Sequence, residues 1–165
     1  MSQTEQRPGL GRRGEMLVAI QFALMIVFVV TPVWRPGLSD SVVVDLLVPR
    51  LILAVPLAVI ALILGGLGSH HIRHYLTPLP YPVDHSQLIQ HGVYGVVRHP
   101  LYSSLLSAAL AWTLYSLSLS HLLLLVVGFL FFDIKARKEE GWLTERHPEY
   151  REYARRVPKF IPYLY

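Results

Sequence analysis

The residues best suited to chemistry in this sequence lie in one short segment, from His91 to Tyr102. Arg98 and His99 supply a fixed cation and a group that exchanges protons near neutral pH. Pro100 follows directly and suits the first position of a helix, where its missing N–H costs nothing. A long apolar run begins there, so the basic pair is predicted to lie at the mouth of a membrane helix. Such a turn can hold an anionic or zwitterionic molecule, or it can serve only as an interfacial anchor.

A pair of acids, Glu139 and Glu140, comes one predicted helical hairpin later. An up-and-down pair of helices brings its two ends together, so these carboxylates and the pair Arg98-His99 are predicted to line one pocket. A zwitterionic amino acid group fits such a pocket, because its carboxylate pairs with basic side chains and its amine with glutamate. A sulfonium group would lie against tyrosine faces through cation–π attraction. This placement fails if either hairpin helix does not return across the membrane.

Long apolar blocks are typical of an all-α membrane protein. Hydrophobic residues make up 53% of the 165 residues and charged residues only 16%. The apolar runs predict an integral membrane bundle of about four transmembrane helices: 16–33, about 46–67, 100–117 and 119–132. The last helix is expected to continue out of the membrane to about Arg146. The chain has no cysteine, which excludes disulfides, zinc–thiolate sites and thiol nucleophiles.

The predicted topology is that of one membrane domain over residues 1–165. It has a flexible N-terminus at 1–15 and its first two transmembrane helices within 16–67. Four spans place both termini on one side of the membrane. All Lys and Arg residues except Arg35 and Arg50 then fall on that side. The positive-inside rule makes it the cytoplasm, so the termini and the pocket are predicted to be cytoplasmic.

The other histidines and basic residues have simple explanations. His70 and His74 are spaced to share a helix face and could bind a metal. A cationic cap that favours the dipole at a helix C-terminus explains them equally well, and no metal is expected. The net charge of +4 comes mostly from the C-terminal tail and from helix ends. Topology and anionic lipid account for that charge more simply than nucleic acid does.

The segment from Gly92 to Tyr102 also resembles a known signature. It reads Gly-Val-Tyr-Gly-Val-Val-Arg-His-Pro-Leu-Tyr. This is similar to the pattern G-x-Y-x-x-x-R-H-P-x-Y of the isoprenylcysteine carboxyl methyltransferase family and the related phospholipid methyltransferases. The C-terminal pattern of the same family resembles Glu139-Glu-Gly-Trp-Leu143, His147-Pro-Glu-Tyr-Arg-Glu-Tyr153 and Val157-Pro-Lys-Phe-Ile-Pro162. The resemblance covers about 76–165, the family-like catalytic region.

The resemblance implies an enzyme that transfers a methyl group from S-adenosylmethionine inside a membrane helical bundle, without a Rossmann domain. It implies a lipid or lipidated, membrane-soluble acceptor, methylated on a carboxyl oxygen or an amine nitrogen. The implied cofactor contacts are Gln87, Leu88, Ile89, Tyr94, His99, Pro100, Leu101, Tyr102 and Glu139. A substrate-associated arginine of the family aligns with Lys135, which keeps the charge but lacks the planar fork.

The implied chemistry asks mainly for alignment, because a sulfonium is already an activated electrophile. The protein has to hold methyl donor, acceptor and leaving sulfur in line and to exclude water. Arg98, His99 and Glu140 are the expected catalytic residues. A carboxylate acceptor needs no base, whereas an amine acceptor must lose a proton, for which Glu140 and His99 are the candidate bases. The acceptor is expected to enter sideways from the bilayer.

Two other functions fit the same sequence. Membrane reductases of sterol double bonds also resemble the C-terminal region, and they use NADPH. A non-catalytic membrane scaffold could keep the fold without binding a cofactor. Binding of S-adenosylhomocysteine, of NADPH or of neither compound distinguishes the three possibilities.

Overall fold

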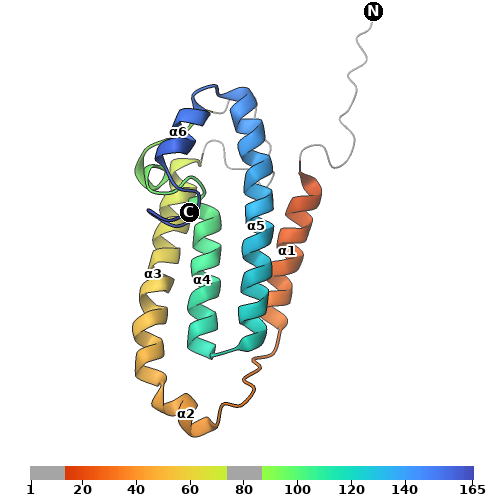
Figure 1. The fold of residues 1–165 in the computed structure, drawn as a ribbon, viewed down its shortest axis with the longest axis vertical. Coiled ribbons are helices and arrows are strands. Elements are labelled where there is room, and N and C mark those ends of the chain that lie inside the picture. The colour runs from red at the N-terminus through yellow and green to blue at the C-terminus, as the bar shows by residue number, and fades with distance from the viewer. Residues whose placement is uncertain (1–13, 74–86) are drawn as a thin grey trace, which may run out of the picture.

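The computed structural model describes residues 14–73 and 87–165, and these residues contain helices but no strands (Figure 1). The predicted all-α fold is therefore confirmed. The elements are α1 (Glu15–Val30), α2 (Asp40–Asp45), α3 (Leu47–His71), η1 (Gly92–Gly95), α4 (Pro100–Ser116), α5 (Leu119–Arg146) and α6 (Tyr150–Arg156). The N-terminal residues 1–13 and His74 lie outside the described ranges.

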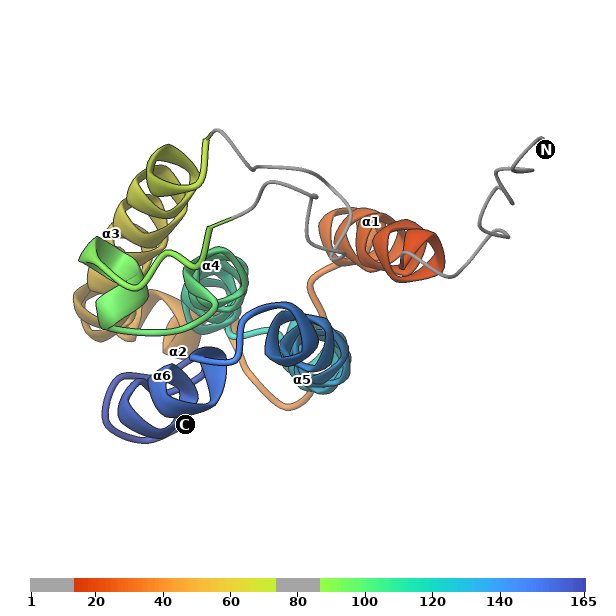
Figure 2. The same cartoon turned by 90° about the horizontal axis from the view of Figure 1, so that it is seen from above.

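The four long helices α1, α3, α4 and α5 run up and down through one bundle (Figure 1). Seen from above, they follow the order α3, α4, α5, α1, and each helix contacts the next (Figure 2). The start of α1, the end of α3, the start of α4 and the end of α5 lie at the upper end of Figure 1. The short helices η1 and α6 lie at this upper end as well, so it collects all the candidate residues.

Two of the long helices are long and apolar enough to cross a membrane. They are α3, with 25 residues, and α5, with 28. A core helix of a soluble protein would be mostly buried, but only 17% of the apolar stretch of α3 and 22% of that of α5 are buried. Large apolar side chains such as Leu62 and Ile52 are exposed, as expected for a surface that faces lipid. These features are those of a membrane protein.

The other two long helices are shorter than predicted. Helix α1 has 16 residues and α4 has 17. Sixteen residues rise about 24 Å, less than the bilayer core of about 30 Å. Two helices of the bundle thus satisfy the length criterion for a full span, and crossing by α1 and α4 remains a prediction.

The glycine-rich stretch of α3 lies inside the helix, whereas the sequence suggested that it ends the span. Gly65 faces Ser104 of α4, whose hydroxyl donates to the carbonyl of Ala61 at 2.7 Å. A Cβ atom on Gly65 would lie 2.7 Å from that hydroxyl, and one on Gly68 would lie 3.1 Å from Leu101. These glycines let α3 and α4 approach closely, as small residues do in membrane bundles.

The lower end of the bundle is held by two arginines that bind backbone carbonyls. Arg50 donates to the carbonyls of Tyr115 and Val43, both at 2.7 Å. Arg35 donates to the carbonyl of Ser116 at 2.6 Å. Both arginines therefore lie at the end opposite to the candidate residues, as the topology argument requires.

Candidate functional site

The basic turn lies between η1 and the first residue of α4. Gly92, the first residue of η1, has a φ of 62°, in the left-handed region that favours glycine. A Cβ atom here would also overlap the imidazole of His71 at the end of α3. Pro100 occupies the first turn of α4, as predicted, and this fixes Arg98 and His99 at the helix entrance.

One oxygen of Glu140 joins the acidic pair of α5 to the basic turn before α4. The Nε and Nη2 atoms of Arg98 donate to Oε1 of Glu140 at 3.0 and 2.8 Å. Nε2 of His99 lies 3.0 Å from the same oxygen. Since Glu140 belongs to α5 and the basic pair precedes α4, the hairpin does return. The two clusters that the sequence placed at its ends are in direct contact.

Glu139 lies on the other side of the His99 ring. Its Oε2 accepts a hydrogen bond from the Tyr102 hydroxyl at 2.9 Å and lies 3.6 Å from Nδ1 of His99. The rings of His99 and Tyr102 are stacked, with centroids 5.3 Å apart. Tyr102 stacks in turn on Phe132 of α5 at 5.0 Å. His99 is thus buried between two carboxylates, and aromatic packing fixes its orientation.

The C-terminal tail, residues 157–165, closes this corner from outside. The backbone N–H groups of Arg98 and His99 donate to the carbonyls of Pro158 and Lys159 at 2.9 and 3.1 Å. Nη1 of Arg98 donates to the carbonyl of Val157 at 2.5 Å. Without the tail these groups at the helix entrance would need other acceptors.

Phe160 anchors the same tail in the protein core. Its side chain is buried in a cluster with Phe132 and Ala136 of α5. Its carbonyl accepts a hydrogen bond from the hydroxyl of Ser103 at 2.8 Å. Both contacts fix the tail against the protein.

Lys135, the residue aligned with a family substrate contact, is buried between α1 and α5. Its Nζ atom donates to Oε1 of Gln21 at 2.5 Å and lies 5.1 Å from the centre of the Tyr102 ring. It lies one helical turn before Glu139. The structure therefore places a buried cation over the ring of Tyr102, whose hydroxyl binds Glu139.

Asp133 has one predicted partner and two further ones. The sequence suggested Lys135 or Arg137, and Arg137 does pair with it at 2.7 Å. The second cation is Lys159 of the tail, also at 2.7 Å, in place of Lys135. The hydroxyl of Tyr165 donates to the same carboxylate at 2.9 Å, so Asp133 fastens the tail to α5.

Three tyrosines surround the cluster on the side of α6. The Tyr153 hydroxyl donates to the carbonyl of Tyr94 at 2.6 Å, which ties α6 to η1. The rings of Tyr150 and Tyr153 meet edge to face with centroids 5.6 Å apart. Burial raises the pKa of the Tyr94, Tyr150 and Tyr153 hydroxyls, so all three stay protonated at neutral pH.

The remaining predicted cofactor residues flank the basic turn in the sequence. Leu101 is half-buried in the first turn of α4. Gln87, Leu88 and Ile89 lie in the irregular segment before η1, with Gln87 exposed and the other two half-buried. These three residues remain predicted contacts.

Of the two histidines spaced to share a helix face, His70 and His74, the second lies outside the described residues. Within residues 14–73 and 87–165, no three His, Asp or Glu side chains are grouped to hold a metal ion. His71, the neighbour of His70, has its Nδ1 atom 2.6 Å from the carbonyl oxygen of Leu67.

The site has two unlike carboxylates. Oε1 of Glu140 is saturated by three donors from two side chains. The side chain of Glu139 keeps 25% of its surface exposed. Glu139 is therefore the carboxylate available to a cationic ligand, and the tyrosine faces beside it suit an ammonium or a sulfonium.

Sequence reasoning missed the contribution of the tail carbonyls. Arg98 was expected to face a ligand, but Nη1 is occupied by main-chain oxygens of Ala154 and Val157. Backbone acceptors carry no side-chain signature. The only signal was the resemblance of Val157-Pro-Lys-Phe-Ile-Pro162 to a family motif, which marks the segment without saying what it contacts.

Comparison with protein families gives a match over residues 49–150, which includes all but the first two residues of α3, the basic turn and both glutamates. The matching family is described as phospholipid methyltransferase. No solved structure gives a significant match.

Individual relatives have several different names. A Delta(14)-sterol reductase of Mus musculus is 42% identical over 84 residues, covering 48% of this chain and 20% of the relative. The cobalt-zinc-cadmium resistance protein CzcN of Cupriavidus metallidurans is 37% identical over 78 residues, covering 47% and 36%. Protein-S-isoprenylcysteine O-methyltransferase B of Arabidopsis thaliana is 32% identical over 83 residues, covering 49% and 42%. The matched part is thus less than half of each of these relatives.

Proposed function

The chain belongs to the phospholipid methyltransferase family, and we propose that it is a membrane enzyme that transfers a methyl group from S-adenosylmethionine to a lipid or lipidated acceptor. One observation carries this proposal. The arginine–histidine turn of α4 and the glutamate pair of α5 form one hydrogen-bonded cluster at the upper end of the bundle. That cluster joins the two motifs on which the family resemblance rests.

The residues present fit such a cofactor by their chemistry. We propose that Glu139 and the faces of Tyr94 and Tyr102 accommodate its ammonium and sulfonium groups, because Glu139 is the less committed acid. The other contacts proposed by family resemblance are Gln87, Leu88, Ile89, His99, Pro100 and Leu101. When bound, the cofactor supplies a methyl group on an activated sulfonium.

The residues around the reacting centre have different proposed roles. We assign Glu140 a positioning role through its Oε1, which accepts from both Arg98 and His99. Its second oxygen takes no part in these bonds, so Glu140 and His99 both stay candidate bases for an amine acceptor. A carboxylate acceptor needs none. Arg98 holds Glu140 and the tail together and so keeps water out of the corner.

The acceptor is proposed to approach from the lipid side, along α1 and α5. Lys135 offers the buried cation there, and an anionic group on the acceptor would replace the amide of Gln21 as its partner. Lysine holds such a group as a point charge, without the bidentate geometry of arginine. The acceptor whose anionic group pairs with Lys135 determines which atom is methylated.

We also propose that the upper end of the bundle faces the cytoplasm. The two arginines of the opposite end, Arg35 and Arg50, are outnumbered by the basic residues at the upper end. The positive-inside rule favours this orientation.

Ligand binding to the purified protein in detergent tests the proposed activity. Isothermal titration should detect S-adenosylhomocysteine and not NADPH. The reverse result would favour a reductase, which the identity with the mouse sterol reductase makes the second candidate. Binding of neither compound would point to a scaffold.

Membranes that contain the wild-type chain provide the matching activity test. They should transfer label from methyl-labelled S-adenosylmethionine to lipid-extractable material or to a lipidated protein. Membranes with the Glu139→Gln variant should transfer less. Labelling confined to water-soluble products would contradict the proposed route of the acceptor through the bilayer.

A further inference from the structure

Tyr150 carries a buried hydroxyl without a hydrogen-bond partner. Only 3% of the residue is exposed. Within the described part of the chain, its OH and Nε2 of His147 are the buried side-chain polar atoms that find no partner. Leaving a buried donor unsatisfied costs about 1–3 kcal/mol, so native structures rarely keep one without a reason.

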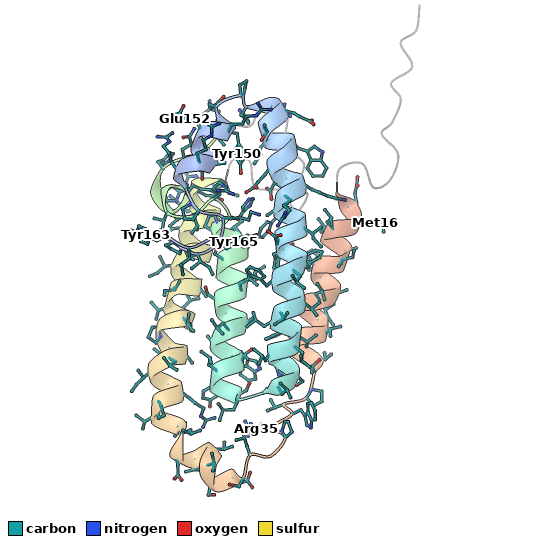
Figure 3. The ribbon with its side chains drawn as sticks, in the orientation of Figure 1. Met16, Arg35, Tyr150, Glu152, Tyr163 and Tyr165 are labelled. Carbon is teal, nitrogen blue, oxygen red and sulfur yellow. The ribbon has the colours of Figure 1, made fainter. Side chains whose placement is uncertain are left out.

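The position of Tyr150 suggests what that reason is. It is the first residue of α6, which packs against α5 at the upper end of the bundle (Figure 3). Its edge-to-face contact with Tyr153 holds the ring in place from the side of α6. The charges that act on its hydroxyl are those of Glu140, Arg98 and Glu139, which belong to the hydrogen-bonded cluster of the proposed site. The unsatisfied hydroxyl therefore lies beside the site.

The hydrogen bonds of the neighbouring acids go to other donors. Oε1 of Glu140 is occupied by Arg98 and His99, and Oε2 of Glu139 accepts from Tyr102. Tyr150 remains protonated at neutral pH and is therefore a donor. A donor that is fixed, buried and unpaired beside a binding site is suited to an acceptor atom that arrives with the ligand.

We propose that the Tyr150 hydroxyl donates a hydrogen bond to the bound S-adenosylmethionine and so is a cofactor-binding residue. The partner is an oxygen or nitrogen acceptor of the cofactor and not the lipid acceptor. The reason is that α6 lies beyond the polar end of α5, away from the apolar stretch where a lipid would enter. This inference rests on the proposed function, since it concerns the same cofactor.

Three tyrosine-to-phenylalanine variants test it, each of which removes one hydroxyl. Tyr150→Phe loses an unpaired hydroxyl, so the melting temperature of the ligand-free protein should stay equal or rise. Its dissociation constant for S-adenosylhomocysteine should increase about three- to tenfold, the value of one net hydrogen bond. Tyr153→Phe loses the bond to the Tyr94 carbonyl, so it should lower the melting temperature. Tyr163→Phe changes a fully exposed side chain and should alter neither quantity.

The outcomes separate this inference from the proposed function. If the wild-type protein binds S-adenosylhomocysteine and Tyr150→Phe binds it equally well, the role of Tyr150 is refuted and the methyltransferase proposal stands. If the wild-type protein does not bind, both fail. Should Tyr150→Phe not fold, a structure of the wild-type protein with S-adenosylhomocysteine decides. The hydroxyl must then lie within about 3.5 Å of a cofactor oxygen or nitrogen, and a greater distance overturns the inference.

Discussion

Glu140 holds three hydrogen-bond donors with one oxygen atom, whereas Glu139 next to it holds one close donor. Adjacent residues of a helix point in different directions, so the two carboxylates reach opposite nitrogens of the His99 ring. One glutamate is thereby part of the framework, and the other is the proposed contact of the cofactor. Because both residues are glutamates, the sequence does not show that their roles differ.

Charge-removing substitutions of the two glutamates should therefore differ. Glu140→Gln leaves the half-buried guanidinium of Arg98 without its counter-charge and should destabilise the protein by about 2 kcal/mol. Glu139→Gln retains an acceptor for Tyr102 and should change stability little, but it should weaken S-adenosylhomocysteine binding. Thermal unfolding and titration calorimetry measure the two effects. Equal loss of stability in both variants would contradict the assignment.

Alkaline pH should destabilise the protein through its buried tyrosines. The folded-state pKa values of Tyr94, Tyr150 and Tyr153 are raised above the ordinary value of about 10. A raised pKa contributes stability that is complete below about pH 10 and is lost as the pH rises through the folded-state value. We expect the free energy of unfolding to fall above about pH 10.

Ultraviolet absorbance of tyrosinate tests this pH dependence. The exposed Tyr163 should ionise first, and the buried tyrosines should ionise only together with unfolding. A Tyr153→Phe variant should show a smaller buried phase. Ionisation of every tyrosine in one step, with the fold intact, would show that these side chains are accessible to solvent.

The contact between Arg98 and Glu140 could be foreseen, because a helical hairpin must bring its ends together. The partner of Lys135 could not. Gln21 lies 114 residues away on a helix that carries no motif, so nothing in the sequence fixes the register of α1 against α5. The unpaired hydroxyl of Tyr150 is likewise visible only in coordinates, since a sequence shows donors but not which of them lack acceptors.

At the scale of elements, the glycines of α3 set the distance to α4. A Cβ atom on Gly65 would press on the Ser104 hydroxyl, whereas one on Gly66 meets nothing within 4 Å. Both Gly→Ala changes gain the same helix propensity, so their difference isolates the packing. We expect Gly65→Ala to be less stable than Gly66→Ala by about 1 kcal/mol, the value of the Ser104 bond that it disturbs. Equal melting temperatures would show that α3 and α4 are not held by this contact.

The tail depends on a single buried aromatic anchor. Phe160 is buried against Phe132 and next to His99, with ring centroids of the latter pair 5.8 Å apart. Phe160→Ala should cost about 3 kcal/mol of stability and weaken cofactor binding, because the ring supports His99. The neighbouring Ile161 is exposed, so Ile161→Ala serves as the control and should have little effect. Thermal unfolding compares the two variants.

The elements were predicted with uneven success. Apolar runs located all four long helices, since hydrophobicity is a strong signal over that length. The end of α3 was misplaced, because glycines inside a membrane helix look like a terminator until the neighbouring helix is seen. Docking of the tail depends on main-chain oxygens, which have no residue-type signature.

At the scale of the whole molecule, the up-and-down bundle separates two polar ends. The upper end holds the cluster, and the lower end is held by Arg35 and Arg50. The charge asymmetry that predicts the orientation is carried by the whole chain and not by any one residue. Orientation is accordingly best tested with probes at the two ends.

The lack of native cysteine makes such probes simple. Glu149→Cys at the upper end and Ser39→Cys at the lower end are both at exposed positions. In sealed right-side-out vesicles, a membrane-impermeant maleimide should label Ser39→Cys and spare Glu149→Cys. Inside-out vesicles should reverse the pattern, and detergent should expose both. Labelling of both cysteines from one side would show that the bundle does not cross the bilayer.

The tail contacts of Arg98 and His99 have one more consequence. The same nine residues that bind Asp133 also accept from the backbone N–H groups of Arg98 and His99, just before α4, and from one nitrogen of the guanidinium. Removing them would leave the two amides without these acceptors, beside the His99 ring that binds Glu140. We therefore expect a chain cut after Arg156 to lose the order of the Arg98–His99 turn together with the tail itself.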